Sequence, residues 1–166
     1  LLAILMGCDQ SPSPPRATQP SPTETPQPWF KDVAGDSGID FVWHSGADDS
    51  FLMPEIVGGG VAMIDYDMDG DEDLYFIQGG NMATAWKEPQ RNTSGNRMYR
   101  NDGNMRFTDV TERTRTGDGG YGMGVAVGDI DNDGDPDLYL TNVGRNTMLR
   151  NDQGVFTDIT DESGTG

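Results

Sequence analysis

One stretch of this chain is present twice, which indicates a fold built from repeated structural units. The first copy is GVAMIDYDMDGDEDLY at residues 60–75, and the second is GVAVGDIDNDGDPDLY at residues 124–139. A second block combines an MxRND segment with a phenylalanine segment, and its copies lie at 98–111 and 148–160. Such repeats are typical of arrays in which each unit packs against its neighbours.

The phenylalanine segments mark where the repeat units begin. They read FKDV, FTDV and FTDI and start at Phe30, Phe107 and Phe156. Counted in this way, the chain holds a first unit at 29–106, a second at 107–155 and the start of a third at 156–166. The first unit is the longest, and we interpret its extra residues, around 40–53 and 81–95, as loop insertions on a repeat scaffold.

Each unit contains short apolar runs that are typical of strands. Residues 60–64 and 74–77 are apolar, and nine polar residues between them predict a loop that joins two strands. Asn101-Asp102-Gly103 predicts a hairpin closed by a type I′ turn. Units of about 50 residues with four strands each are the mark of β-propeller blades. The sequence therefore predicts an all-β fold, a partial β-propeller with two four-stranded antiparallel blades and the start of a third.

The loop between the first two strands of each blade carries aspartates at alternate positions. Carboxylates spaced in this way converge on one point as the chain curls, and a glycine at position 6 permits the sharp turn. We expect two Ca²⁺ sites, with side-chain ligands at positions 1, 3, 5 and 9 and a main-chain carbonyl at position 7. The candidate ligands are Asp65, Asp67, Asp69, Asp71 and Asp73 in the first loop and Asp129, Asp131, Asp133, Asp135 and Asp137 in the second.

Two other interpretations of these loops have less support. A single Asp-rich loop is often a solvated turn that binds no ion, but the presence of two such loops with the same spacing argues against this interpretation here. Mg²⁺ keeps several of its waters and rarely uses an all-protein cage. An EF-hand is excluded, because position 12 would be a glutamate and is occupied here by Phe76 and Leu140.

The charge of the chain favours cations as partners. It has 28 acidic and 11 basic residues among 166, a formal net charge of −17, so direct binding of nucleic acid is not expected. The single cysteine excludes an internal disulfide.

The beginning of the chain resembles a secretory signal followed by a tether. Residues 1–8, LLAILMGC, match the end of a signal peptide with a bacterial lipobox, which implies lipidation of Cys8 and anchoring to a membrane. An ordinary signal peptide is the alternative. Residues 9–28 hold seven prolines and predict a disordered, extended linker. We therefore expect a lipoprotein of the bacterial cell envelope, periplasmic or at the cell surface.

The loop pattern, with Gly-Val-Ala before it and Leu-Tyr after it, resembles the FG-GAP or VCBS repeat of integrin-α-type propellers. Residues 30–33, 38–41, 58–62 and 65–67 are further similar to bacterial members of the ASPIC/UnbV, cartilage-acidic-protein-like family. The resemblance implies a seven- or eight-bladed propeller with calcium loops in successive blades, usually extracytoplasmic and engaged in binding.

The expected function is a binding or adhesion scaffold for a protein or a carbohydrate. A polysaccharide lyase or hydrolase with catalytic residues outside this sequence is the alternative, and a role in assembling envelope partners is a third. No catalytic residue is assigned, and His44 is expected to be structural. The recurring Phe30, Phe107 and Phe156 are expected to anchor blade packing. Arg100 and Arg150 are expected to form a structural ion pair or a backbone contact within each blade rather than to bind an anion.

Overall fold

In a computed structural model of the protein, residues 28–47, 51–80 and 95–166 are described. Cys8, Trp86 and the expected signal and linker up to residue 27 lie outside these residues. The chain divides into two compact units, and all of the strands belong to the unit Asp32–Gly166. No helix in the described part of the chain is long and apolar enough to cross a membrane.

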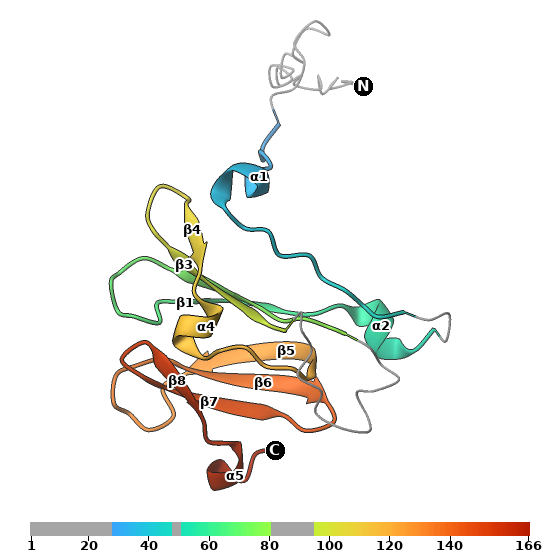
Figure 1. The fold of residues 1–166 in the computed structure, drawn as a ribbon, viewed down its shortest axis with the longest axis vertical. Coiled ribbons are helices and arrows are strands. Elements are labelled where there is room, and N and C mark those ends of the chain that lie inside the picture. Colours follow the sequence, from blue (N-terminus) through green and yellow to red (C-terminus); the bar gives the residue numbers. More distant parts are fainter. Residues whose placement is uncertain (1–27, 48–50, 81–94) are drawn as a thin grey trace, which may run out of the picture. The chain divides into compact units, whose positions relative to one another are not determined.

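Two four-stranded antiparallel sheets form this unit, and in each sheet the strands are paired in the order of the sequence (Figure 1). The first sheet consists of β1 (Val61–Ile64), β2 (Asp73–Phe76), β3 (Arg97–Asn101) and β4 (Phe107–Asp109). The second sheet consists of β5 (Tyr121–Gly128), β6 (Asp137–Val143), β7 (Thr147–Asp152) and β8 (Val155–Asp158). The all-β prediction is confirmed, and the sheets are consistent with two blades of a partial β-propeller.

The sheets are offset by one strand from the units counted from the phenylalanines. Phe107 lies in β4 and Phe156 in β8, so each sheet ends with a strand that the counting assigned to the following unit. Residues 156–166 therefore supply the last strand of the second sheet. The offset arises because β3 and β4 form one hairpin with a short turn, so β4 belongs to the first sheet. The longer connection, residues 110–120, then joins β4 to β5 of the second sheet.

The β3–β4 hairpin is present, but its turn differs from the predicted type I′. Gly103, Asn104 and Met105 all have positive φ, and Asp102 does not, so three residues rather than two turn the chain. In the second sheet Asp152 pairs with Val155, and Gln153 and Gly154 between them have φ of 53° and 85°. These are the signs of a type I′ turn. The segment from Met98 to Phe107 is one residue longer than the equivalent segment from Met148 to Phe156, and this extra residue accounts for the different turns.

Among the described residues of the unit, four short helices accompany the sheets: α1 (Ala34–Ser37), α2 (Met53–Val57), α4 (Thr111–Thr114) and α5 (Thr160–Ser163). Three of them follow the phenylalanine segments and begin in the same way. The carboxylates of Asp32, Asp109 and Asp158 each accept a hydrogen bond from the backbone N–H two residues later, at 3.0, 2.9 and 2.9 Å. The helix after the Phe30 segment thus begins like the other two, although residues 30–33 themselves form no strand, in contrast to β4 and β8.

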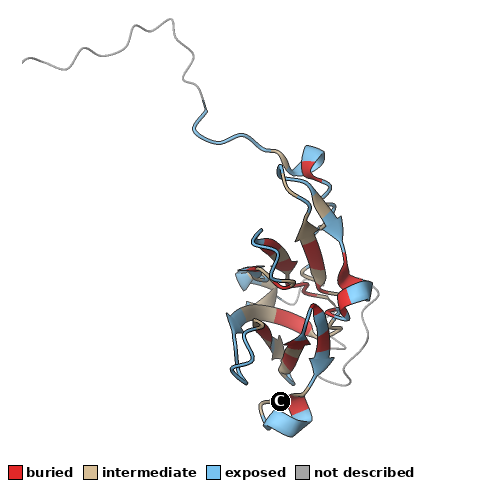
Figure 2. Ribbon diagram, turned by 90° about the vertical axis from the view of Figure 1, so that its left-hand side faces the viewer, coloured by how far each residue is buried: buried red, intermediate tan, exposed pale blue. Residues whose placement is uncertain are grey.

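The core lies between the facing sides of the two sheets (Figure 2). Tyr75 and Met98 enter it from the first sheet, and Leu138 and Leu140 enter it from the second. Phe156 is also in this core and only 2 % exposed, as predicted for an anchor of blade packing. Phe30 is 92 % exposed within the other compact unit, Leu1–Lys31, and its role as an anchor of blade packing stays a prediction.

The opposite side of the first sheet is covered by residues 39–45. Phe41 stacks on Phe76 with ring centroids 4.9 Å apart, and the hydroxyl of Tyr99 donates to Asp40 at 2.6 Å. The backbone of His44 donates to the side chain of Gln78 and accepts from Gly80, and its ring is exposed. The contacts of His44 are thus structural, as predicted.

Candidate metal centres

The two acidic loops connect equivalent strands and bring together the same three positions. The first loop joins β1 to β2, the second joins β5 to β6, and both lie at the end of the sheets where the β3–β4 and β7–β8 turns lie (Figure 1). In each loop the aspartates at positions 1, 3 and 9 offer carboxylate oxygens that all lie within 4.8 Å of one another. The groups are Asp65, Asp67 and Asp73, and Asp129, Asp131 and Asp137.

The aspartate at position 9 is the buried anchor of each loop. Asp73 accepts hydrogen bonds from the backbone N–H groups of Tyr66, at 3.2 Å, and Asn101, at 2.7 Å. Asp137 accepts the equivalent bonds from Ile130 and Asn151, both at 2.7 Å. Each carboxylate therefore fastens the start of its own loop to the third strand of its own sheet.

The aspartate at position 1 closes the loop on itself. Asp65 accepts from the backbone N–H groups of Asp69 and Gly70, both at 3.0 Å. Asp129 accepts from Asp133 at 3.2 Å and from Gly134 at 3.1 Å. The glycines have φ of 93° and 99°, which residues with a Cβ rarely adopt, so their place at position 6 has the expected steric reason.

The aspartates at positions 5 and 7 lie outside the three-carboxylate groups. One oxygen of Asp69 accepts from the N–H of Asp71, and one of Asp133 accepts from Asp135, both at 2.9 Å. The side chain of Asp135 accepts from the N–H of Gln153 at 2.8 Å. The side chains of Asp69, Asp133 and Asp135 therefore accept hydrogen bonds from backbone N–H groups and do not join the three-carboxylate groups.

Burial and mutual repulsion disfavour the charged carboxylates. Burial raises the pKa of Asp73 to about 6, and the negative charges of Asp67 and Asp69 act in the same direction. The pKa of Asp131 is also raised, first by loss of hydration and then by the charges of Asp133 and Asp137. A bound cation would offset both effects by favouring the ionised carboxylates.

One oxygen in the first loop is an independent indication that a cation fits there. Oδ1 of Asp67 is shielded from solvent and has no hydrogen-bond partner in the described part of the chain. A buried carboxylate oxygen without a donor is costly unless a positive charge compensates it. The groups consist of oxygens alone, which suits hard cations. These Asp-rich clusters can therefore hold a metal ion, and their chemistry is compatible with calcium.

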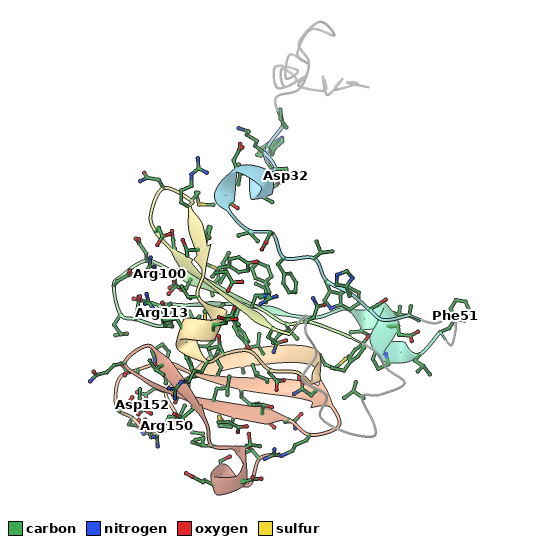
Figure 3. The ribbon with its side chains drawn as sticks, viewed as in Figure 1. Asp32, Phe51, Arg100, Arg113, Arg150 and Asp152 are labelled. Atoms are coloured by element: carbon green, nitrogen blue, oxygen red, sulfur yellow. The ribbon has the colours of Figure 1, made fainter. Side chains whose placement is uncertain are left out.

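The two repeated arginines form ion pairs within their own sheets, as predicted, and they lie beside the loops (Figure 3). Arg100 donates from Nε and Nη2 to one oxygen of Asp102, at 2.8 and 2.5 Å. Arg150 donates to Asp152 at 3.1 Å, and its Nε also lies 3.8 Å from Oδ2 of Asp131. Only the second loop therefore has an arginine within ion-pair distance of a clustered carboxylate, among the residues described.

Sequence reasoning missed the role of the repeated asparagines Asn101 and Asn151. Their backbone N–H groups bind the buried aspartates, and their side chains bind loop carbonyls. The signal was present, because both occupy the same place in the MxRND segment.

The chain was compared with known proteins. Residues 65–140 match the model of a family described as FG-GAP-like repeat. The matched segment runs from the first aspartate of the first loop through the whole of the second loop. None of the curated proteins matches the chain. The match supports an FG-GAP-type repeat protein and suggests a β-propeller-type binding scaffold, in agreement with the two sheets.

Proposed function

We propose that the protein is a calcium-stabilised β-propeller scaffold of the bacterial cell envelope that binds a protein or a carbohydrate. The observation that carries the calcium part is the duplication of the site. Two loops 64 residues apart in the sequence group the same three carboxylates and hold them with the same backbone hydrogen bonds. Each loop thus presents the same set of carboxylate oxygens, which suits a hard cation such as calcium.

Each ion would be held by the clustered aspartates of one loop. Asp65, Asp67 and Asp73 supply side-chain oxygens in the first loop, and Asp129, Asp131 and Asp137 supply them in the second. The aspartates at position 5 lie outside these groups, and with an ion bound Asp69 and Asp133 would have to approach it to serve as the further side-chain ligands, with main-chain carbonyls of Asp71 and Asp135 completing the set. The ion supplies positive charge where burial and repulsion disfavour the carboxylates, so its effect is to stabilise the loops.

The test of the calcium sites is a titration followed by thermal melting. A 100-fold excess of calcium over Kd should stabilise the protein by about 2.7 kcal/mol for each independent site. We expect Asp67→Asn and Asp131→Asn each to lose part of this gain and the double variant to lose all of it. Asp161→Asn is the matched control, because it removes the same charge at a side chain that is 95 % exposed and distant in sequence from both loops. If the double variant responds to calcium as the unmodified protein does, the site assignment is wrong.

Membrane anchoring is the second part of the proposal. It depends on the lipobox-like residues 1–8 and on the proline-rich residues 9–28, which would hold the domain away from the membrane. The full-length protein expressed in bacteria should incorporate labelled lipid, and Cys8→Ala should abolish both incorporation and partitioning into membranes. A Cys8→Ala protein that still partitions with membranes would contradict the anchor.

A further inference from the structure

Asn151 makes side-chain hydrogen bonds to the backbone of both acidic loops. It lies in β7 and is fully buried. Its side-chain Nδ2 donates to the carbonyl of Tyr66 in the first loop, at 2.8 Å, and to the carbonyl of Pro136 in the second, at 3.2 Å. Its Oδ1 accepts from the N–H of Gly154 at 2.8 Å. The polar atoms of this side chain are therefore fully engaged, and two of the bonds link one loop to the other.

The carbonyls that Asn151 binds lie next to clustered carboxylates. Tyr66 stands between Asp65 and Asp67, and Pro136 directly precedes Asp137. The backbone N–H of Asn151 also donates to Asp137 at 2.7 Å. A shift of either loop backbone therefore has to be accommodated by the same buried side chain.

The packing around Tyr66 strengthens this connection. Its side chain is fully buried and contacts Phe156 of β8, with ring centroids 6.5 Å apart. Its hydroxyl accepts a hydrogen bond from Arg113 at 3.3 Å. A Cβ placed on Gly154 would lie 3.4 Å from the Tyr66 ring and 3.6 Å from Cβ of Asp67, so the β7–β8 turn is in close contact with the first loop.

Asn101 provides an internal comparison, because it occupies the equivalent position in the first sheet. Its Nδ2 donates to the carbonyl of Glu72, in its own loop, at 3.1 Å, and its Oδ1 accepts from Gly103 at 3.0 Å. Within the described residues it makes no bond to the other loop. Both asparagines therefore make equivalent hydrogen bonds within their own sheet. Among the described residues, only Asn151 also binds the other loop, through the carbonyl of Tyr66.

We propose that Asn151 is a positioning residue that couples the two cation sites, so that a cation in one loop raises the affinity of the other. This inference rests on the proposed calcium sites. An ion in the first loop fixes the backbone at Tyr66, which fixes Asn151 and with it the backbone beside Asp137. The second loop is then partly ordered before it binds, and the coupling is equal in both directions.

Terbium luminescence can measure the first site separately. Tyr66 lies between two ligands of the first loop and can sensitise a terbium ion there, whereas Ile130 occupies the equivalent position in the second loop. The affinity of the first site for terbium is measured in the unmodified protein and in Asp131→Asn, which disables the second site. We expect Asp131→Asn to weaken terbium binding at the first site about fivefold or more, the lower end of typical coupling between sites.

The same comparison is then made in two asparagine variants. In Asn151→Ala the additional Asp131→Asn change should no longer affect terbium affinity at the first site. In Asn101→Ala, the matched control, the effect of Asp131→Asn should persist. Because Asn151→Ala removes buried hydrogen bonds and can unfold the protein, a second measurement uses the native asparagine. In Asp131→Asn, loading the first site with calcium should shift the NMR signals of the Asn151 side-chain amide and of the Asp137 backbone amide.

The outcomes separate this inference from the proposed function. If both loops bind ions and Asp131→Asn leaves the first site unchanged, or if the coupling survives in Asn151→Ala, the role of Asn151 is wrong and the calcium sites stand. Absence of the NMR shifts overturns the coupling in the same way. If neither terbium nor calcium binds, the proposed calcium sites fail and the coupling fails with them.

Discussion

The two acidic loops share one pattern but lie in different surroundings. Tyr66 at position 2 of the first loop is fully buried against the second sheet, whereas Ile130, its equivalent, is 46 % exposed. Asp65 and Asp67 are half-buried, and Asp129 and Asp131 are exposed. The burial of Tyr66 comes from its contact with Phe156 and the β7–β8 turn of the second sheet, and the shared loop pattern alone does not produce it.

Their electrostatic surroundings also differ. Asp67 has a buried oxygen without a donor, whereas Asp131 lies 3.8 Å from the Nε of Arg150. An adjacent positive charge weakens cation binding, so the first loop should bind calcium more tightly than the second. If the shared hydrogen bonds of the buried aspartates dominate, equivalent substitutions in the two loops should change stability equally. If the surroundings dominate, the two loops should differ in calcium affinity.

The largest effect is expected from removal of the buried anchors. Asp73→Ala and Asp137→Ala each leave two backbone N–H groups without an acceptor, so each should lower the free energy of unfolding by about 2 to 4 kcal/mol. Urea unfolding in calcium-free buffer measures the loss. Because both anchors make the same bonds, the two losses should agree within about 1 kcal/mol.

Asparagine at the same positions is the control for this prediction. Asp73→Asn and Asp137→Asn keep one acceptor oxygen and should cost less than alanine. An alanine variant that unfolds with the stability of the unmodified protein would show that these hydrogen bonds do not hold the loops.

A second prediction concerns the pH dependence of the calcium-free protein. The pKa of Asp73 is raised to about 6 in the folded protein, above the ordinary value of about 4. The folded state therefore binds the proton more tightly than the unfolded state, and the contribution of Asp73 to stability decreases as the pH rises from about 4 to about 6. A shift of this size corresponds to at most about 3 kcal/mol.

Unfolding by urea at several pH values measures this trend, and Asp73→Asn should remove it. Saturating calcium should reverse the trend, because the ion favours the ionised carboxylate and protons compete with it at low pH. If stability decreases over this pH range by the same amount in Asp73→Asn, groups other than Asp73 cause the decrease.

Repetition made much of the fold predictable from the sequence. The offset between the two copies located both loops, and the short apolar runs on either side of each loop located β1, β2, β5 and β6. The loop glycines, Gly70 and Gly134, were predictable because a sharp turn with positive φ excludes most other residues.

Other features depend on contacts between segments that are distant in the sequence. The burial of Tyr66 and the bond from Asn151 to its carbonyl require the second sheet to pack against the first loop, which no local pattern shows. The different turns at Gly103 and Gly154 follow from a single extra residue. The convergence of positions 1, 3 and 9, without 5 and 7, is a property of the folded loop that the even spacing of the aspartates does not show.

A smaller effect is expected at position 4 of the loops, where both residues have a left-handed backbone. Met68 has φ of 58° and Asn132 has φ of 59°. Asparagine adopts this conformation more readily than methionine, and Met68 is 60 % exposed, so little packing is lost. Met68→Asn should stabilise the protein by about 0.5 to 1 kcal/mol, and Asn132→Met should destabilise it by a similar amount. Thermal melting measures both, and a destabilising Met68→Asn would contradict the argument.

The smallest effect is expected at Arg150, and it concerns affinity rather than stability. Two unit charges 4 Å apart interact by about 1 kcal/mol in water, so Arg150→Ala should strengthen calcium binding by the second loop about two- to fivefold. Its ion pairs are partly exposed, so the free energy of unfolding should change little. Calorimetric titration in an Asp67→Asn background measures the second loop alone. Arg100→Ala is the control and should affect the first loop less, because among the described residues Arg100 forms no ion pair with a clustered carboxylate, whereas Arg150 lies 3.8 Å from Asp131. Equal gains in the two loops would show that the arginines act at long range, and the difference between the loops would then depend on burial alone.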